Sequence, residues 1–277
     1  MLNLVSDSSC DLRSVDIGGP QIRLQVIPMH LHIGHKDFPD DEDLNLRQIL
    51  DAMAKSSSSS TACPSPQAFA DAFAQGDESI CVTISSPLSG TYQAAVTGRE
   101  LALSQDPEKK IFVLDSRSTA GCMVLLLRKA AALYEDGRPF EEICDILTTY
   151  RDNLRTCFTL MSFHNLIQAG RMKPITGALL QSLGIHVIAQ ATPEGTISVA
   201  GKARGEVKTY QAIVEQMQKS KNCRGAEVIV SHCENLVGAV RLKEQILKEL
   251  PVRSVEIRSC RGLTGYYAME GGLILAY

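Results

Sequence analysis

The sequence predicts an α/β protein of two domains, with a parallel sheet in the first domain and a mixed sheet in the second. Its 277 residues are enough for two domains of ordinary size. In the first half an apolar strand, a polar loop and a helix follow one another repeatedly, which is typical of a parallel sheet with helices on its faces. In the second half a hairpin interrupts that order and favours a mixed sheet. We place the boundary near Leu154, so the predicted domains are residues 1–154 and 155–277.

The composition is that of a globular protein with reduced cysteines. Hydrophobic residues make up 44% of the chain, but no apolar run reaches the ~20 residues that span a bilayer, and the run Cys122–Leu127 is short enough for a buried helix. No basic segment or cleavage site follows Met1, so we expect a cytoplasmic protein. The nine cysteines include no C-x-x-C pair, which argues against a disulfide or zinc framework. A net charge of −3 without a basic cluster argues against nucleic acid as a partner.

The chain begins with two extended segments, residues 2–6 and Val26–Ile33. His30 and His32 share one face of the second segment, because side chains alternate along a strand. No carboxylate or cysteine stands at a convincing ligand spacing beside them. We therefore interpret the two histidines as the polar face of an edge strand and predict no metal site.

A serine-rich segment follows, held between two predicted helices. Leu44–Lys55 has apolar residues at helical spacing, and Gln67–Gln75 resumes a helical pattern after Pro66, a residue suited to the start of a helix. The five serines between them are typical of a flexible linker when taken alone. Because both ends are fixed by helices, we interpret this segment as a loop whose hydroxyl groups, including that of Thr61, are candidates to face a site.

The most informative stretch joins a predicted strand at residues 80–84 to a predicted helix that begins at Thr91. The join reads Ser-Ser-Pro-Leu-Ser-Gly and ends with Ser89 and Gly90. It places hydroxyl groups beside the free N–H groups of the first helical turn, where an anion is favoured. The join lacks the glycine spacing and lysine of a phosphate loop, and it is not the nucleophile elbow of a hydrolase, so a carboxylate fits better. The alternative is that Ser89 only caps the helix.

The remaining elements complete the two predicted sheets. After the strand Ile111–Leu114, helices are expected at about 118–135 and at Phe140–Asn153. Ligands of parallel sheets bind outside the carboxyl ends of the strands, where the loops at Ser6-Asp7, Ser85-Ser86 and Asp115-Ser116 lie. The second half is predicted to contain, in order, a strand Cys157–Ser162, helices Asn165–Ala169 and Pro174–Leu183, a hairpin Ile185–Ala191 with Thr196–Ala200, a helix Val207–Lys219, a strand Glu227–Ser231, a helix Leu236–Leu250, a strand Val252–Ile257, a glycine-bounded loop Gly265–Gly272 and a final strand Leu273–Tyr277.

Taken together, these motifs resemble the DegV family of fatty-acid-binding proteins, and the resemblance runs from Val5 to Tyr277. The motifs that carry it are Val5-Ser6-Asp7-Ser8, Thr61-Ala62-Cys63-Pro64-Ser65-Pro66, Ser85-Ser86-Pro87-Leu88-Ser89-Gly90-Thr91-Tyr92, Leu114-Asp115-Ser116 and Gly170-Arg171-Met172. The Leu-Ser-Gly-Thr-Tyr corner is the most specific of them.

The resemblance implies that a long-chain fatty acid such as palmitate lies buried between the two domains. It implies hydroxyl groups at Thr61 and Ser89 that hold the carboxylate, and the predicted ligand site also includes Ser86, Gly90 and Tyr267. By this resemblance the protein is not an enzyme and needs no cofactor. It is a lipid carrier, or it presents the carboxylate to a separate fatty acid kinase subunit.

The surface expected to face that kinase carries Arg171, Lys202 and Arg204. Two bases at a helix start, as we expect for Lys202 and Arg204, are also common as simply solvated residues. The tail loop departs from the family pattern, since Tyr267 replaces a histidine and Glu270 lies where the family has a Gly-Pro-Gly turn. Tyrosine carries no positive charge at pH 7, and Glu270 adds a negative one. We therefore expect fatty acid binding with poor support of acyl-phosphate formation.

Two other functions compete with lipid binding. A serine hydrolase that acts on acyl esters through Ser89 needs a histidine within hydrogen-bond reach, and the candidates His164, His186 and His232 lie in the second half without a recognisable triad context. A small-molecule kinase subunit with a nucleotide at the Ser-Gly corner lacks the phosphate-loop lysine and an acidic metal-binding pattern.

Overall fold

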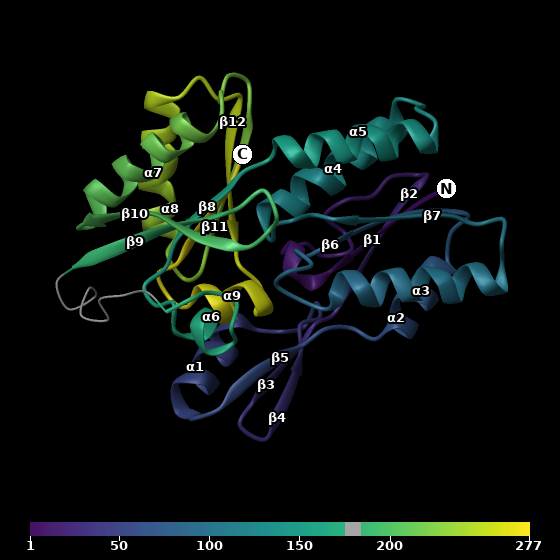
Figure 1. Ribbon diagram of the computed structural model, residues 1–277, viewed down its shortest axis with the longest axis horizontal. Helices are drawn as coiled ribbons and strands as arrows, with labels where there is room; N and C mark the ends of the chain where they lie inside the picture. The colour runs from purple at the N-terminus through teal and green to yellow at the C-terminus, as the bar shows by residue number, and fades with distance from the viewer. Residues whose placement is uncertain (175–183) are drawn as a thin grey trace.

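Three β-sheets organise the chain in the computed structural model, which describes residues 1–174 and 184–277 (Figure 1). A parallel sheet has the order β2-β1-β6-β7, a mixed sheet the order β10-β9-β8-β13-β11-β12, and a small antiparallel sheet the order β4-β3-β5. The strands are β1 (Leu2–Asp7), β2 (Ile22–Ile27), β3 (His30–Ile33), β4 (Lys36–Pro39), β5 (Ser59–Ala62), β6 (Glu78–Thr83), β7 (Lys110–Asp115), β8 (Thr156–Thr159), β9 (Ile185–Ala191), β10 (Ile197–Arg204), β11 (Glu227–His232), β12 (Ser254–Ser259) and β13 (Leu273–Ala276). The predicted α/β fold with a parallel and a mixed sheet is confirmed.

The parallel sheet is covered on both faces by helices. Along β1 the side chains of Leu2 and Leu4 pack with α4 (Gly121–Glu135) and α5 (Phe140–Asn153), whereas Val5 packs with α2 (Pro66–Phe73) and α3 (Thr91–Gln105). This alternation is the consequence of the two-residue period of a strand. It explains why these strands are apolar on both faces and carry their polar groups at their ends.

Helix α4 is the central element because it lies between the two larger sheets (Figure 1). Ten of its residues are buried, among them the whole predicted apolar run Cys122–Leu127. At its first residue, Gly121, an added Cβ would lie 2.8 Å from the Cβ of Ala276 on β13 and 2.9 Å from the Cβ of Ile229 on β11. The mixed sheet therefore lies so close to the start of α4 that only glycine fits at position 121.

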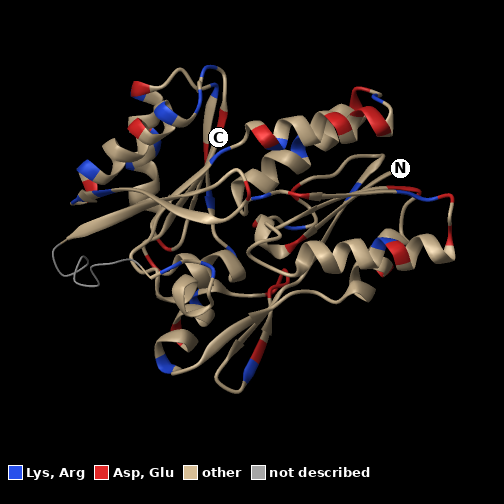
Figure 2. Cartoon of the chain, in the orientation of Figure 1, with Lys and Arg blue, Asp and Glu red and all other residues tan. Residues whose placement is uncertain are grey.

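The mixed sheet is covered on its other face by α7 (Glu206–Ser220) and α8 (Leu236–Glu249). Three shorter helices, α1 (Leu46–Lys55), α6 (His164–Gln168) and α9 (Gly262–Ala268), lie near the small sheet, and a 3-10 turn covers Ser8–Cys10 (Figure 1). Basic and acidic residues are dispersed over the described parts of both halves (Figure 2). None of the helices described is long and apolar enough to cross a bilayer.

Helix α9 begins on two buried carboxylates that come from the other end of the chain. Asp40 accepts hydrogen bonds from the backbone N–H groups of Gly262 and Leu263, at 2.9 and 2.8 Å. Asp11 accepts from the backbone N–H of Arg261 at 2.8 Å. Burial raises the pKa of Asp11 to about 7 and also raises that of Asp40. The free N–H groups of the helix start offset part of the cost of burying these acids.

Several local predictions are wrong. The segment Val26–Ile33 is two strands, because Pro28 cannot donate a ladder hydrogen bond, and β2 and β3 then enter different sheets. The serine-rich segment is not a loop throughout, since β5 pairs with β3. Consequently β3 is a middle strand rather than an edge strand.

The predicted tail loop Gly265–Gly272 begins instead as the last part of α9, whose start is fixed by residues distant in sequence. The other predicted helices and strands of the described residues are present with shifted ends. The predicted helix Pro174–Leu183 falls almost wholly on residues 175–183, outside those described, and the domain boundary near Leu154 stays a prediction.

The predicted histidine pair is polar, as expected, and has a partner. His30 and His32 place their Nδ1 atoms 2.8 and 3.1 Å from the two carboxylate oxygens of Asp37 on β4. No group of three side chains suited to hold a metal ion occurs among residues 1–174 and 184–277.

The packing at α4 gives a first prediction. Gly121→Ala is expected to lower the free energy of unfolding by about 1–3 kcal/mol, because the added methyl group overlaps two backbone-anchored Cβ atoms. Urea denaturation measures the change. The matched control is Gly201→Ala, where the nearest atom to an added Cβ is 3.9 Å away and little change is expected. Equal stability of the Gly121→Ala protein and wild type would contradict the close approach of the sheet to α4.

Candidate functional site

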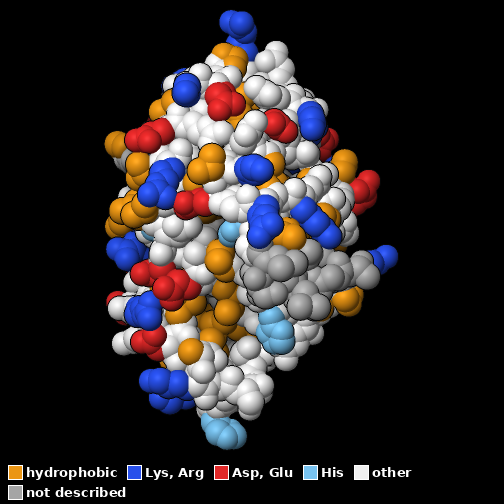
Figure 3. Space-filling model, turned by 90° about the vertical axis from the view of Figure 1, so that its left-hand side faces the viewer, with side chains coloured by type: hydrophobic (Ala, Val, Ile, Leu, Met, Phe, Trp, Pro, Cys, Tyr) orange, Lys and Arg blue, Asp and Glu red, His pale blue; other side chains and the backbone are white. Residues whose placement is uncertain are grey.

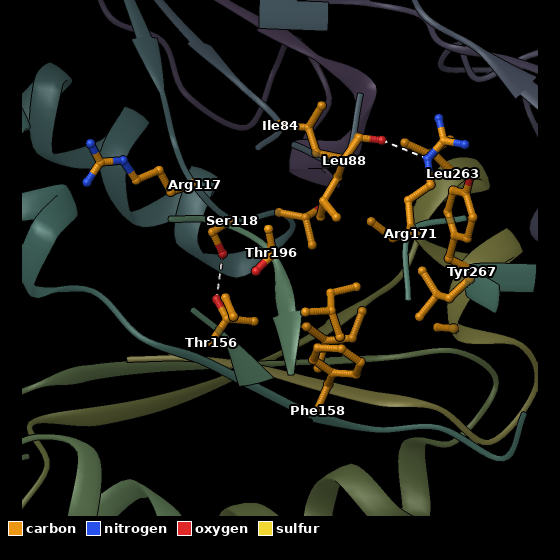
Figure 4. A pocket seen from close by; sticks show the side chains of 18 of the residues that line it. Ile84, Leu88, Arg117, Ser118, Thr156, Phe158, Arg171, Thr196, Leu263 and Tyr267 are labelled. Carbon is orange, nitrogen blue, oxygen red and sulfur yellow. Dashed lines mark hydrogen bonds between the residues drawn. The ribbon is translucent and has the colours of Figure 1, made fainter. Parts of the chain in front are cut away.

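A narrow cavity with almost entirely apolar walls lies between the parallel and mixed sheets (Figure 4). It encloses about 730 Å³ of empty space, part of it open to solvent. Its walls come from both halves of the chain: Ile84, Leu88, Arg117, Ser118 and Thr119 from the first, and Thr156, Phe158, Leu160, Leu166, Arg171, Ala191, Gly195, Thr196, Ile197, Leu263, Thr264, Tyr267, Ala268 and Ile274 from the second. A cavity with walls of this polarity suits an apolar ligand with few polar groups.

The two ends of the cavity are chemically different from its walls. Tyr267 and Arg171 lie at one end, and Ser118, Thr156 and Arg117 at the other (Figure 4). We call these the tyrosine end and the serine end. Between them the lining is dominated by side chains such as Leu88 and Phe158. The cavity is therefore an apolar passage with a polar group at each end.

At the tyrosine end, α9 is joined to β5 by two hydroxyl contacts. The hydroxyl of Tyr267 lies 2.9 Å from Oγ1 of Thr61, and that of Tyr266 lies 2.8 Å from Oγ of Ser59. The two tyrosine rings meet edge to face, with centroids 4.8 Å apart. Thr61 does not line the cavity itself, but its hydroxyl group is hydrogen-bonded to that of Tyr267, which lines it. Thr61 and Tyr267, predicted from distant segments, are thus neighbours.

Ser89 lies just before α3, whose cap position is Gly90. Its Oγ is 2.8 Å from Oγ1 of Thr91, whereas the cap position of the helix is occupied by Gly90 without a side-chain bond. A Cβ added to Gly90 would lie 3.5 Å from Sγ of Cys63, which brings this loop beside the segment that holds Thr61. Oγ of Ser89 also accepts a hydrogen bond from the backbone N–H of Thr91 at 3.4 Å, so Ser89 contacts the free N–H of the first helical residue although Gly90 holds the cap position.

Ser86 is separate from the other predicted ligand residues. Its side chain is exposed, and its backbone N–H donates to Oδ1 of Asp115 at 3.1 Å. Among the described residues no hydrogen bond links its hydroxyl group to Thr61, Ser89 or Tyr267. The expectation that Ser86 belongs to the same corner finds no support in these contacts.

The three predicted partner-facing bases lie in two different places. Arg171 lines the cavity and its Nε donates to the carbonyl oxygen of Leu88 at 2.9 Å, so it ties the second half to the loop before α3. Lys202 and Arg204 are exposed on β10, an edge strand of the mixed sheet. We expected both residues at a helix start, but they lie on a strand, because β10 extends to Arg204 and α7 begins only at Glu206.

The negative charge that Glu270 adds is paired with a cation. Its carboxylate lies 3.2 Å from the guanidinium of Arg47 on α1, which also pairs with Asp51 at 3.1 Å. Tyr267 points its hydroxyl to Thr61 instead. The difference between this tail loop and the family pattern therefore rests mainly on the tyrosine.

The geometry does not supply the catalytic base that a hydrolase needs. Within the part of the chain that the structure describes, no hydrogen bond joins Ser89 to a histidine. His232, the one buried candidate of the three, accepts at Nδ1 from the backbone N–H of Asn235, and burial lowers its pKa. Ser89 therefore lacks the partner that activates a serine nucleophile.

Sequence reasoning missed most of the cavity. The apolar walls of the second half and the serine end were not predicted as ligand-facing, and neither was the position of Arg171 in the wall. The position of Ser118, just after the end of β7, was the available signal, since ligands of parallel sheets bind there.

On the face shown in Figure 3, hydrophobic side chains are also visible in a hollow, so apolar surface is exposed on this side of the molecule.

Comparisons with known proteins give concordant results. The pattern of the family described as "Uncharacterised protein, DegV family COG1307" matches residues 1–276. A DegV domain-containing protein of Streptococcus pyogenes serotype M1 is 33% identical over 275 residues, which are 99% of this chain and 98% of the relative.

Two solved structures are similar along their whole length. One is a DegV family protein from Eubacterium eligens loaded with heptadecanoic acid, with a TM-score of 0.93, 32% identity and coverage of 100% of this chain and 99% of the other. The other is the fatty acid kinase B3 protein of Streptococcus pneumoniae loaded with linoleic acid, with a TM-score of 0.95, 30% identity and coverage of 100% and 98%. The full-length family match and these relatives show that this chain belongs to the DegV family.

Proposed function

We propose that this protein binds a long-chain fatty acid in the cavity between the two sheets, as a lipid carrier or presenting subunit and not as an enzyme. The observation that carries the proposal is an apolar passage whose tyrosine end has hydroxyl groups and a guanidinium group beside it. A fatty acid has the matching chemistry, an alkyl chain with one anionic end. The related proteins of Eubacterium eligens and Streptococcus pneumoniae, crystallised with heptadecanoic and linoleic acid, support the same ligand class.

The alkyl chain supplies the affinity in this proposal. Burying a ~16-carbon chain at ~0.8 kcal/mol per methylene corresponds to on the order of 12 kcal/mol of transfer free energy. Ordering the chain and the loss of free translation and rotation offset a substantial part of that gain. Micromolar or tighter binding remains.

The carboxylate belongs, in this proposal, at the tyrosine end. Thr61 and Tyr267 each have a hydroxyl group there, and Ser89 lies on the neighbouring loop at the start of α3. Arg171 adds a positive charge in the wall of the same end. Hydrogen bonds from hydroxyl groups to a carboxylate are charge-assisted and short, so these groups fix the direction of the chain.

The first test is direct. Protein purified from cells is expected to carry a long-chain fatty acid, because the apolar transfer term exceeds the ordering cost. Native mass spectrometry detects the bound mass, and a thermal-shift assay of delipidated protein with added palmitate measures rebinding. Repeated extraction without lipid, together with no thermal shift from palmitate, would contradict the proposal.

The carboxylate site gives a third prediction. Ser89→Ala and Thr61→Val are each expected to weaken palmitate binding by roughly 1.5–3 kcal/mol, since each removes a donor to a charged group. Titration calorimetry with delipidated protein measures the affinity. Ser60→Ala is the matched control, because Ser60 is exposed on the same strand as Thr61 and the affinity should stay at the wild-type value. If Ser89→Ala and Thr61→Val also bind palmitate like wild type, the carboxylate lies elsewhere.

A role with a fatty acid kinase is the finer part of the proposal. One similar structure is named as a fatty acid kinase B3 protein, which supports a kinase subunit as the partner. A carboxylate that attacks a phosphoryl group must approach other negative charges, and a nearby cation lowers this repulsion. The uncharged Tyr267 lowers this repulsion less than a protonated histidine does.

Tyr267→His combined with Glu270→Pro is therefore expected to raise the rate of kinase-dependent ATP turnover, with little change in fatty acid affinity. Glu270→Pro alone is the control, and it is expected to leave the rate near that of wild type because Glu270 is paired with Arg47. A wild-type rate equal to that of a histidine-bearing family member would show that the tyrosine performs the same task.

A further inference from the structure

A second pocket, polar and positively charged, lies directly behind the serine end of the apolar cavity. It shares Arg117, Ser118, Thr156 and Ala191 with the cavity, so the two spaces adjoin at these residues. The pocket encloses about 1020 Å³ of empty space, part of it open to solvent. The end of the apolar passage that is remote from Tyr267 therefore faces a polar space rather than more hydrophobic core.

The side chains of this pocket carry more positive than negative charge. Its walls include three arginines and a lysine, but a single carboxylate; these residues are Arg117, Arg151, Arg155, Lys219 and Asp152. Oδ1 of Asp152 is shared by Arg117 at 3.2 Å and Arg151 at 2.9 Å. Glu194 lies outside the walls of the pocket. The pKa of its carboxyl group is lowered, first by the hydrogen bond from Thr192 and also by the positive charge of Arg117.

Two of the four cations lack an acidic partner. No ion pair among the described residues includes Arg155 or Lys219, and the guanidinium of Arg155 donates to two backbone carbonyl oxygens, those of Asp152 and Leu154, both at 2.7 Å. The neighbouring Lys221 has a lowered pKa, first because of burial and also because of the positive charge of Arg155. The excess of positive charge in this pocket favours the binding of an anion.

A pair of hydroxyl groups stands between this pocket and the cavity. Ser118 and Thr156 are both buried, and their hydroxyl groups are hydrogen-bonded to each other (Figure 4). Oγ1 of Thr156 also lies 3.1 Å from Sγ of Cys122. The methyl end of an ordinary fatty acid gains nothing from hydroxyl groups or from nearby guanidinium groups. A carboxylate gains from both.

We propose that the serine end is a second anion-binding site and that the ligands of this protein include long-chain α,ω-dicarboxylic acids. The first carboxylate lies at the tyrosine end, so this inference rests on the proposed function. The second carboxylate accepts a hydrogen bond from whichever hydroxyl group of the Ser118–Thr156 pair does not donate to the other, and it faces the positive charge of Arg155 and Lys219. The ligand is then held at two points a fixed distance apart.

Titration calorimetry of delipidated protein with palmitate and with hexadecanedioic acid tests the inference. The wild-type affinities are expected to lie within about tenfold of each other, whereas an apolar chain end would reject a second carboxylate by roughly 100-fold or more. In a series of dicarboxylic acids of increasing length the affinity is expected to pass through a maximum, because both ends are fixed. Added salt should weaken hexadecanedioic acid more than palmitate.

The variants Arg155→Gln and Lys219→Gln identify the second site. Each is expected to weaken hexadecanedioic acid by about tenfold, as the loss of a charged partner does, and to leave palmitate within twofold. Matched controls are Arg224→Gln and Lys208→Gln, which remove the same charges from exposed positions outside both pockets and should change neither ligand.

The outcomes separate this inference from the proposed function. Absence of palmitate binding to the wild-type protein contradicts the proposed function. Tight palmitate binding with hexadecanedioic acid weaker by more than about 100-fold overturns the second site alone. If Arg155→Gln weakens palmitate as much as hexadecanedioic acid, the second site is overturned too, because the positive pocket then holds the carboxylate of an ordinary fatty acid.

Discussion

The burial of helix α4 between two sheets is the constraint on which the rest of the structure depends. Its first residue has no side chain, because β11 and β13 leave no space for a Cβ at that point. The two sheets are thereby held at a fixed separation along one side of the molecule. On the other side of this contact their loops diverge enough to leave the apolar cavity. Close packing at one place and a cavity beside it are two consequences of the same arrangement.

Contacts that cross between the two halves close the cavity. The hydroxyl group of Ser85 donates to the carbonyl oxygen of Gly195 at 2.7 Å, and Arg171 donates to that of Leu88 at 2.9 Å. On the far side of α4, the guanidinium of Arg128 binds both carboxylate oxygens of Glu256, at 2.6 and 3.1 Å. They add to the hydrogen bonds that α9 makes with Asp11, Asp40 and Thr61 across the same two halves.

Helix α9 shows how buried charge can position a group that faces the cavity. Asp40 satisfies two of the free N–H groups at its start, and Asp11 satisfies the one before them. With its start fixed, the helix directs Tyr267 into the cavity and toward Thr61. The cost of burying two carboxylates is offset locally by the helix start, and the result is a defined hydroxyl group at one end of an otherwise apolar passage.

The sequence by itself determined the fold class, because the order of strand, polar loop and helix, and the two-residue period of the strands, are local properties of the chain. It also brought attention to Thr61, Ser89 and Tyr267, through hydroxyl-rich loops and the resemblance that they carry. Only the tertiary structure decided that β3 and β5 form a separate sheet, that the tail begins as helix α9, and that Arg171 lines the cavity. These features depend on contacts between residues far apart in sequence, such as that of Asp40 with Gly262. A local sequence pattern does not determine which distant group accepts a hydrogen bond from a free N–H, or which side chain lines the cavity.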